Sequence, residues 1–235
     1  GVTHAAMEAS SHGLDQRRLD GVRLKAGAFT NFSQDHLDYH KDFDAYFAAK
    51  ALLFNHILDE GAAAVINIDD PRGREMARIA RDRGLVLTTI GKAEGADLRI
   101  LGQRYDATGQ DLRFSWQGQA HLVRLALIGG FQVENVLAAA GLAIAAGDPA
   151  ERVIEALPGL TTVRGRMELA AMRENGAAVF VDYSHKPGAL ASALQSLRPH
   201  VMGRIIVVFG AGGDRDRLKR PLMGEAARQL SLIHI

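Results

Sequence analysis

The feature that most constrains the fold is an alternation of strand-like and helix-like segments between residues 62 and 91. The stretch "AAAVINID" (62–69) is typical of a buried strand, and Pro71 suits the first turn of a helix. The stretch "LVLTTIG" (85–91) is typical of a second strand. Strands that alternate with helices indicate α/β layers, so we predict a mostly parallel sheet.

The segment before this unit predicts two more strands and two helices. Small and β-prone residues predict a strand over 2–7, followed by a turn and helix within 10–19, and "AGAFTNF" predicts a short strand over 26–32. Asp42 is the expected N-cap of a helix of about 17 residues. The apolar residues of that helix are Phe43, Tyr46, Phe47, Leu52 and Phe54.

Residues 97–128 have a different pattern, which predicts antiparallel strands that turn at Gly109 and Gly118. Proline and glycine without periodicity predict a linker over 157–169. The other elements that we expect are helices at 133–146 and near 149–156, a strand at 177–182, a helix at 187–197, a strand at 204–209 and a helix at 220–230. These patterns predict two domains, residues 1–160 and 161–235.

The composition excludes several classes of protein. Twenty-eight basic and 27 acidic residues give a net charge of +1, so nothing global indicates nucleic acid or an acidic membrane as a partner. The absence of cysteine excludes disulfides and thiolate metal sites, and fits a reducing compartment such as the cytoplasm. No apolar run is long enough to span a bilayer.

Acidic and histidine side chains follow the first two predicted strands. Glu8 follows the strand at 2–7, and Asp35, His36 and Asp38 follow the strand at 26–32. Ligands gather at the carboxyl ends of strands in open α/β sheets, so these groups would converge on a hard cation such as Mg²⁺. The alternative is that Asp35 caps a turn and His36 is a satisfied loop histidine. Taken one residue at a time, the alternative is favoured.

Lys50 stands on a helix whose other residues are largely apolar. The usual explanation is a lysine whose ammonium reaches solvent. The other explanation is a buried lysine, because burial lowers the pKa of the amine and makes its neutral form accessible. Such an amine reacts with CO₂ to give a carbamate, an anion that binds metal where an ammonium would repel it.

The stretch "VVFGAGGDRDRLKRPLM" (207–223) suggests a strand, a glycine-rich turn and the start of a helix. It departs from a dinucleotide fingerprint, because Arg215 replaces the last glycine and no acid follows, which argues against a nicotinamide-dependent oxidoreductase. Four cations against two acids within 214–220 favour anion binding instead.

Seven segments in order resemble the successive motifs of the Mur ligases, and most resemble the MurE-type UDP-N-acetylmuramoyl-tripeptide synthetases. They are "MEASSHGLDQRR", "FTNFSQDHLDYH", "YFAAKALLF", "GGFQVENVLAAAGLA", "GRMEL", "VDYSHKPGAL" and "VFGAGGDRDRLKRPLMG". The resemblance implies an ATPase-like three-layer central domain and the start of a Rossmann-like C-terminal domain. It covers nearly the whole chain.

The resemblance also implies an activity. MurE-type ligases use ATP and Mg²⁺ to add diaminopimelate or lysine to UDP-N-acetylmuramoyl-L-alanyl-D-glutamate, through an acyl phosphate. Diaminopimelate is favoured, because "GGDRDRLKRPLM" looks most like that subgroup. A lysine-adding ligase and a folylpolyglutamate synthetase-like ligase are the alternatives, and "DHLDYH" favours the Mur type over the latter. We expect a cytoplasmic monomer without membrane or nucleic-acid partners.

Residue roles follow from the same resemblance. Glu8, His36 and Lys50, as a carbamate, match the catalytic Mg²⁺ ligands. The residues that match substrate contacts are Ser10, Gln16, Arg18 and Arg215, and those that match nucleotide contacts are Gln132, Asn135, Arg166, Asp182, His185 and Lys219. Gln132 stands where the family usually has asparagine. Without the resemblance, a polar helix start or surface turn would explain the residues near Ser10 and His185 equally well.

We expect this chain to be a fragment of a longer ligase. The phosphate-binding loop of the family would lie before residue 1, and the "DNPR"-type specificity signature would lie after residue 235. The 235 residues alone are therefore expected to be inactive. In the intact enzyme, residues near 157–165 would form the hinge between domains.

Overall fold

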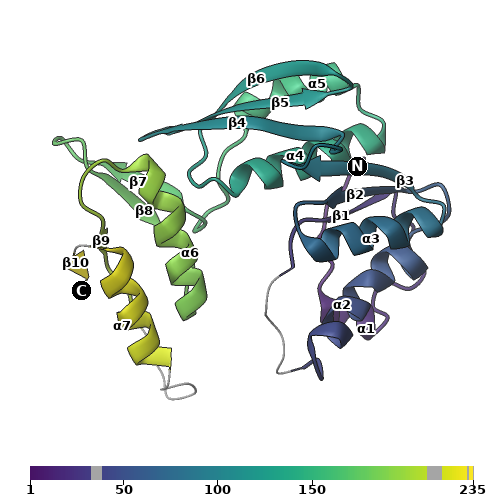
Figure 1. The fold of residues 1–235 in the computed structure, drawn as a ribbon, viewed down its shortest axis with the longest axis horizontal. Helices are drawn as coiled ribbons and strands as arrows, with labels where there is room; N and C mark the ends of the chain where they lie inside the picture. The colour runs from purple at the N-terminus through teal and green to yellow at the C-terminus, as the bar shows by residue number, and fades with distance from the viewer. Residues whose placement is uncertain (33–38, 211–218, 232, 235) are drawn as a thin grey trace. The chain divides into compact units, whose positions relative to one another are not determined.

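The computed structural model describes residues 1–32, 39–210, 219–231 and 233–234 (Figure 1). Its contacts group the chain into two compact units. Unit 1 consists of residues 1–101, 114–121 and 134–155, and unit 2 of residues 102–113, 122–133 and 156–235.

A six-stranded sheet has the order β1-β2-β3-β4-β5-β6. Its strands are β1 (Ala26–Phe29), β2 (Ala63–Asn67), β3 (Val86–Gly91), β4 (Leu98–Asp106), β5 (Gly109–Trp116) and β6 (Gln119–Leu125). The pairs β1–β2, β2–β3 and β3–β4 are parallel, which confirms the predicted sheet. Every residue of β2 is buried, as a strand covered on both faces requires.

The helical segments described within residues 1–156 are α1 (Ser11–Asp15), α2 (Phe43–Leu52), a π-helical turn (Leu53–Ile57), α3 (Pro71–Asp82), α4 (Gln132–Ala146) and α5 (Ala150–Ala156). Two of them, α2 and α3, begin where the capping signals in the sequence predict. The side chain of Asp42 caps α2 by accepting from the N–H of Ala45, and Asp70 caps α3 ahead of Pro71. Phe54, Leu58, Ile66 and Met76 form the centre of the unit 1 core.

The strand predicted over 2–7 is wrong. Residues 1–10 are irregular, and all but Ala9 are exposed. The small β-prone residues of this stretch fit a pleated sheet, but β propensity is realised only against a neighbouring strand. None of the sheets in the described part of the chain includes this segment.

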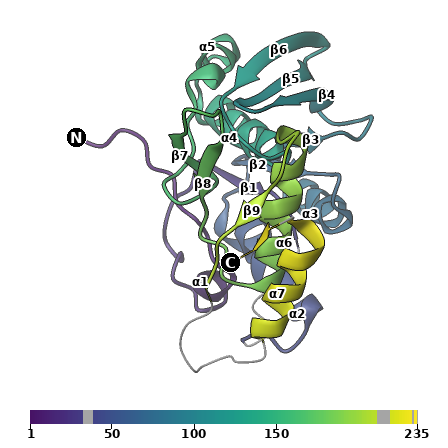
Figure 2. The same ribbon diagram turned by 90° about the vertical axis from the view of Figure 1, so that its left-hand side faces the viewer.

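The C-terminal part of unit 2 contains two short sheets and a pair of helices. Its elements are β7 (Glu168–Met172), β8 (Ala178–Val181), α6 (Pro187–Leu197), a 3₁₀ turn (Arg198–His200), β9 (Ile206–Val207), α7 (Lys219–Leu230) and β10 (Ile233–His234). The antiparallel strands β7 and β8 pair, as do the parallel strands β9 and β10. Helices α6 and α7 lie side by side over a core that includes Leu190, Leu194 and Met223 (Figure 2). Strand β7 begins inside the predicted linker.

Among the described residues, no helix is both long and apolar enough to cross a bilayer.

Two glycines inside helices make opposite predictions for stability. A Cβ on Gly73 in α3 would lie 1.8 Å from the backbone oxygen of Asn67, whereas a Cβ on Gly224 in α7 would meet nothing within 4 Å. We expect Gly73→Ala to lower the free energy of unfolding by about 1–3 kcal/mol, because the backbone must move. Gly224→Ala should raise it by about 0.5–1 kcal/mol through helix propensity. Urea unfolding followed by circular dichroism measures both, and a neutral Gly73→Ala would contradict this packing.

Candidate functional site

Two adjacent aspartates join the carboxyl ends of the first three strands. Asp70, which follows β2, accepts from the N–H of Phe32 at 2.8 Å, just beyond the end of β1. Asp69 accepts from the N–H groups of Lys92 and Ala93, which follow β3, at distances of 2.7–2.9 Å. The strand ends therefore form one fixed edge, the position where open α/β sheets bind ligands.

An aromatic cluster seats helix α2 beside this edge. The ring of Phe32 lies 4.4 Å from that of Phe43, 4.8 Å from Tyr46 and 5.6 Å from Phe47, measured between centroids. Phe47 is also in edge contact with Phe29 of β1. These contacts fix the face of α2 from which Lys50 projects.

Lys50 lies in the last turn of α2 and is half-buried. Its Nζ stands 5.2 Å from the centroid of the Tyr46 ring, a cation–π arrangement. The side chain therefore lies against aromatic surface, as the apolar neighbours in the sequence indicate. Partial burial of this residue is a condition for the carbamate hypothesis, and the contact with Tyr46 equally suits an ammonium.

The predicted metal ligands are described only in part. Glu8 is exposed within the irregular segment before α1. His36, together with Asp35 and Asp38, lies outside the described residues. Within the described ranges, no group of three or more histidine, aspartate and glutamate side chains is placed to bind a metal. The set of Glu8, His36 and Lys50 therefore stays a prediction.

Two of the predicted substrate residues around α1, Gln16 and Arg18, are joined by a hydrogen bond, and Ser10 caps the helix. Ser10 caps α1, since its Oγ accepts from the N–H of Gly13 at 3.0 Å. Beyond the helix, Arg18 donates to Oε1 of Gln16 at 2.6 Å, and Nε2 of Gln16 donates to the hydroxyl of Tyr39 at 3.2 Å. That hydroxyl donates to the carboxylate of Asp15 at 2.8 Å. Gln16 and Arg18 thus present their polar groups as a pair.

Tyr39 is a residue of this site that the sequence interpretation missed. Its ring lies 3.9 Å from that of His12 on α1, and the neighbouring His40 is buried with Nε2 2.9 Å from Oγ of Ser11. A signal existed in Tyr39 and His40, which directly follow the predicted ligands. Nothing in the local sequence shows that these two side chains contact α1.

The predicted nucleotide residues of the C-terminal part form a cluster at the end of β8. Asp182 accepts from the N–H groups of Met167 and Ser184 at 3.0 and 2.9 Å. The Arg166 guanidinium lies 5.6 Å from the ring centroid of Tyr183, and that ring is in edge contact with His185. Tyr183 is exposed and was also missed. This cluster offers an acid, two cationic or polar groups and an open aromatic face.

The other nucleotide residues lie at helix starts. Gln132 is the first residue of α4, and the exposed Asn135 follows one turn later on the same helix. Lys219 is the first residue of α7. Arg215 lies outside the described residues.

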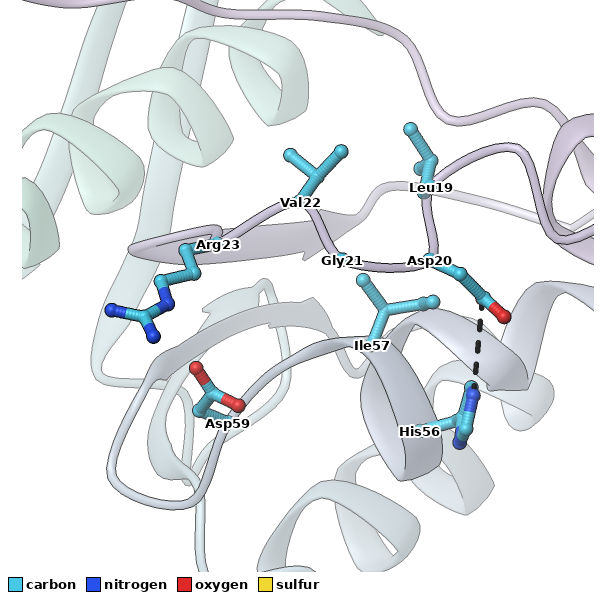
Figure 3. A pocket seen from close by; sticks show the side chains of 8 residues that line it. All are labelled: Leu19, Asp20, Gly21, Val22, Arg23, His56, Ile57 and Asp59. Atoms are coloured by element: carbon cyan, nitrogen blue, oxygen red, sulfur yellow. Dashed lines mark ion pairs between the residues drawn. The ribbon is translucent and has the colours of Figure 1, made fainter.

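A shallow hollow in unit 1 contains none of the predicted site residues (Figure 3). It has a volume of about 570 Å³ and is lined by residues 19–23 and by His56, Ile57 and Asp59. The His56 ring and Asp20 face each other at 3.9 Å across one side of it. This hollow lies between the segment before β1 and the segment after α2, and we assign it no role.

Comparison with known proteins identifies the class that this fold and these residues define. The Mur ligase middle domain matches residues 1–143, and the Mur ligase glutamate ligase domain matches residues 165–234. The chain belongs to the Mur ligase family.

Two similar relatives are ligases of the same name. The UDP-N-acetylmuramoyl-L-alanyl-D-glutamate–2,6-diaminopimelate ligase of Chelativorans sp. (strain BNC1) is 50% identical over 231 residues, 98% of this chain and 48% of the relative. The ligase of the same name from Caulobacter vibrioides is 48% identical over 235 residues, again 48% of its length. The chain thus spans about half the length of the curated relatives that it matches.

One solved structure supports the same family membership. A structure of a UDP-N-acetylmuramoyl-L-alanyl-D-glutamate–2,6-diaminopimelate ligase superposes with a TM-score of 0.76 at 37% identity, over 96% of this chain and 46% of that one.

The half-buried Glu134, in the first turn of α4, predicts a pH-dependent stability. Burial raises the pKa of its carboxyl, with a smaller upward effect from Asp69 and an opposing effect from Lys92. A raised pKa means that the folded state favours the neutral form, so ionisation lowers stability as the pH rises through the folded-state pKa. We expect Glu134→Gln to raise the urea midpoint at pH 7, and this gain to fade toward pH 4. The exposed Glu155→Gln is the control, and an equal gain from both would contradict the assignment to burial.

Proposed function

We propose that the protein containing this chain is an ATP-dependent amide ligase of peptidoglycan precursor synthesis. It adds meso-diaminopimelate to UDP-N-acetylmuramoyl-L-alanyl-D-glutamate. The observation that carries the proposal is identity of about one half, over essentially the whole chain, with several ligases of that name.

The proposed reaction has two steps, both of which crowd negative charge. The terminal carboxylate of the peptide attacks the γ-phosphate of ATP, which gives an acyl phosphate and ADP. The amine of diaminopimelate then attacks the acyl carbon, and phosphate leaves from a tetrahedral intermediate. Catalysis of this kind depends on positioning and on fixed charges aimed at the phosphoryl group.

The described residues support this chemistry in two places. The pair of Gln16 and Arg18 provides a cation and an amide for the anionic nucleotide-sugar peptide, and their mutual contact pre-orients both. The cluster of Arg166, Asp182 and His185 provides the nucleotide side, with Asp182 suited to ribose hydroxyls. Gln132 keeps the donor and acceptor of the usual asparagine for an adenine edge. Arg215 is proposed for a carboxylate of the incoming amino acid, and Lys219 for phosphate.

The carboxylate and the carbamate of the proposed donor set supply the oxygen ligands that Mg²⁺ prefers, and the imidazole would add one nitrogen. Glu8, His36 and carbamylated Lys50 would bind it. When bound, the ion would neutralise charge on the phosphoryl oxygens. The protein's own part is to hold Lys50 half-buried beside the Tyr46 ring, at the position where the proposed carbamate would form.

Lys50→Ala tests the proposed role of the carbamate. In the intact ligase, we expect turnover to fall by about 10²-fold or more, because an anionic ligand is lost. A small added carboxylate should restore part of it. Steady-state rates with and without acetate measure both effects. Lys41→Ala, on the exposed loop before α2, is the control; unchanged turnover in Lys50→Ala would exclude the role.

Tyr39→Phe tests the pairing of Gln16 with Arg18. The substitution removes only the hydroxyl that binds Gln16 and Asp15 and keeps the ring that contacts His12. We expect KM for the UDP-muramoyl dipeptide to rise about three- to tenfold, the range for one net hydrogen bond, with KM for ATP unchanged. Initial rates with each substrate varied measure this. An equal rise in both KM values would contradict it.

A further inference from the structure

The turn that precedes α4 is fixed by three side chains that no step above uses. The turn is residues 127–131, and the side chains are Gln103 of β4, Gln110 of β5 and His200 of the 3₁₀ turn after α6, all in unit 2. Gln110 is completely buried and His200 is 4% exposed. Burying such polar groups costs free energy unless each finds partners.

The two glutamines bind the carbonyl side of the turn. Nε2 of Gln110 donates to the carbonyl oxygens of Leu127 at 3.2 Å and Gly129 at 2.9 Å. Nε2 of Gln103 donates to the carbonyl oxygen of Gly130 at 2.9 Å and to Oε1 of Gln110 at 3.1 Å. The two glutamine side chains therefore bind each other as well as the turn.

His200 binds the amide side of the turn. The N–H of Gly129 donates to Nε2 of His200 at 2.9 Å, and Nδ1 of the same ring lies 2.8 Å from the carbonyl oxygen of Asp106. A carbonyl can only accept, so Nδ1 carries the hydrogen and Nε2 is the bare acceptor. The edge contact with the Tyr105 ring, at 5.0 Å between centroids, fixes the plane of the imidazole.

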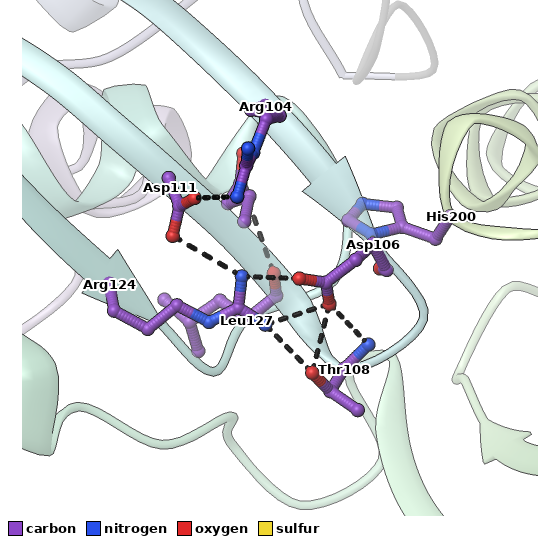
Figure 4. A network of polar contacts seen from close by, with 8 residues as sticks. Arg104, Asp106, Thr108, Asp111, Arg124, Leu127 and His200 are labelled. Carbon is purple, nitrogen blue, oxygen red and sulfur yellow. Dashed lines mark hydrogen bonds and ion pairs between the residues drawn. The ribbon is translucent and has the colours of Figure 1, made fainter.

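The carbonyl that orients His200 is itself held in place. The Asp106 carboxylate accepts from both terminal nitrogens of Arg124 at 2.7 Å and from Thr108 (Figure 4). Figure 4 shows His200 beside Asp106, on the side away from Arg104 and Asp111. Nδ1 of His200 thus binds the carbonyl at the end of β4, and Nε2 binds the turn before α4.

The conformation of residues 127–131 also determines where α4 begins. The carbonyl oxygens of Gly129 and Gly130 accept from the N–H groups of Gln132 and Val133, at 3.1 and 3.4 Å. Gly129 has φ of +102°, and a Cβ there would lie 2.6 Å from the Phe131 ring, so the turn has one narrow conformation. Phe131, just before the helix, has no side-chain oxygen to cap it. The position of the Gln132 backbone is therefore determined by the turn and by the three side chains that bind it.

We propose that His200 is a positioning residue for the nucleotide contact of Gln132. The inference rests on the proposed function, in which Gln132 recognises the adenine. The amide of Gly129 is buried, and leaving a buried donor unpaired costs free energy because it has given up its hydrogen bond to water. Loss of the imidazole acceptor therefore forces the turn to relax, and Gln132 moves with it. Binding of ATP weakens, whereas the sites of the peptide and the amino acid keep their geometry.

The clamp, meaning the hydrogen bond from the Gly129 amide to His200, can be tested on this chain by a measurement that does not need catalysis. Hydrogen exchange at the Gly129 amide should be slow in the wild type and at least about tenfold faster in His200→Leu, which fills similar volume but accepts nothing. His200→Gln places an oxygen within reach of the same amide and should recover most of the protection. His121→Leu is the matched control, because that half-buried ring stacks on Phe114 instead.

The functional consequence is tested in the intact ligase. His200→Leu should raise KM for ATP about three- to tenfold, the range for one net hydrogen bond, with kcat and KM for the dipeptide within about twofold. His200→Gln should restore KM for ATP. Unchanged protection at Gly129, or an equal loss for all substrates, would overturn the inference. A wild-type enzyme that does not ligate would instead refute the proposed function, while the exchange measurement would still decide the clamp.

Discussion

The geometry of unit 1 depends on Asp70. Its carboxylate accepts from the N–H of Phe32, beyond the end of β1, and from the N–H of Arg72 in the first turn of α3. One side chain therefore satisfies a helix N-terminus and joins it to the end of a neighbouring strand. Phe32, held there, is the centre of the aromatic cluster that seats α2. The placement of Lys50 follows from this bond.

Unit 2 reaches a fixed geometry by other means. Where unit 1 uses carboxylates at helix caps, unit 2 uses neutral side chains, Gln103, Gln110 and His200, to bind the backbone of a turn. Neutral amides and imidazole can be buried at lower cost than carboxylates, provided that their donors and acceptors are satisfied.

Much of the fold was predictable because its signals are local. The helix expected over 187–197 is α6 (Pro187–Leu197), and Asp42 and Pro71 begin helices where their capping preferences indicate. The prediction of a strand over 2–7 is wrong because a strand forms only against a neighbouring strand, and the local sequence does not identify that neighbour. In the site, the motifs name Gln16, Arg18, Arg166, Asp182 and His185, whose roles stay predictions. The contacts of Tyr39 with Gln16 and of Tyr183 with Arg166 were not predicted from the sequence.

The sequence by itself determined the α/β class, the start of most helices and membership of the Mur ligases, because capping residues, periodicity and motif order are written within short segments. Only the tertiary structure decided which side chains serve the turn before α4. His200 is separated from Gly129 by 71 residues and from Asp106 by 94. No periodicity or spacing in a chain marks such a contact, since it exists only after distant elements have packed and the buried polar groups have had to find one another.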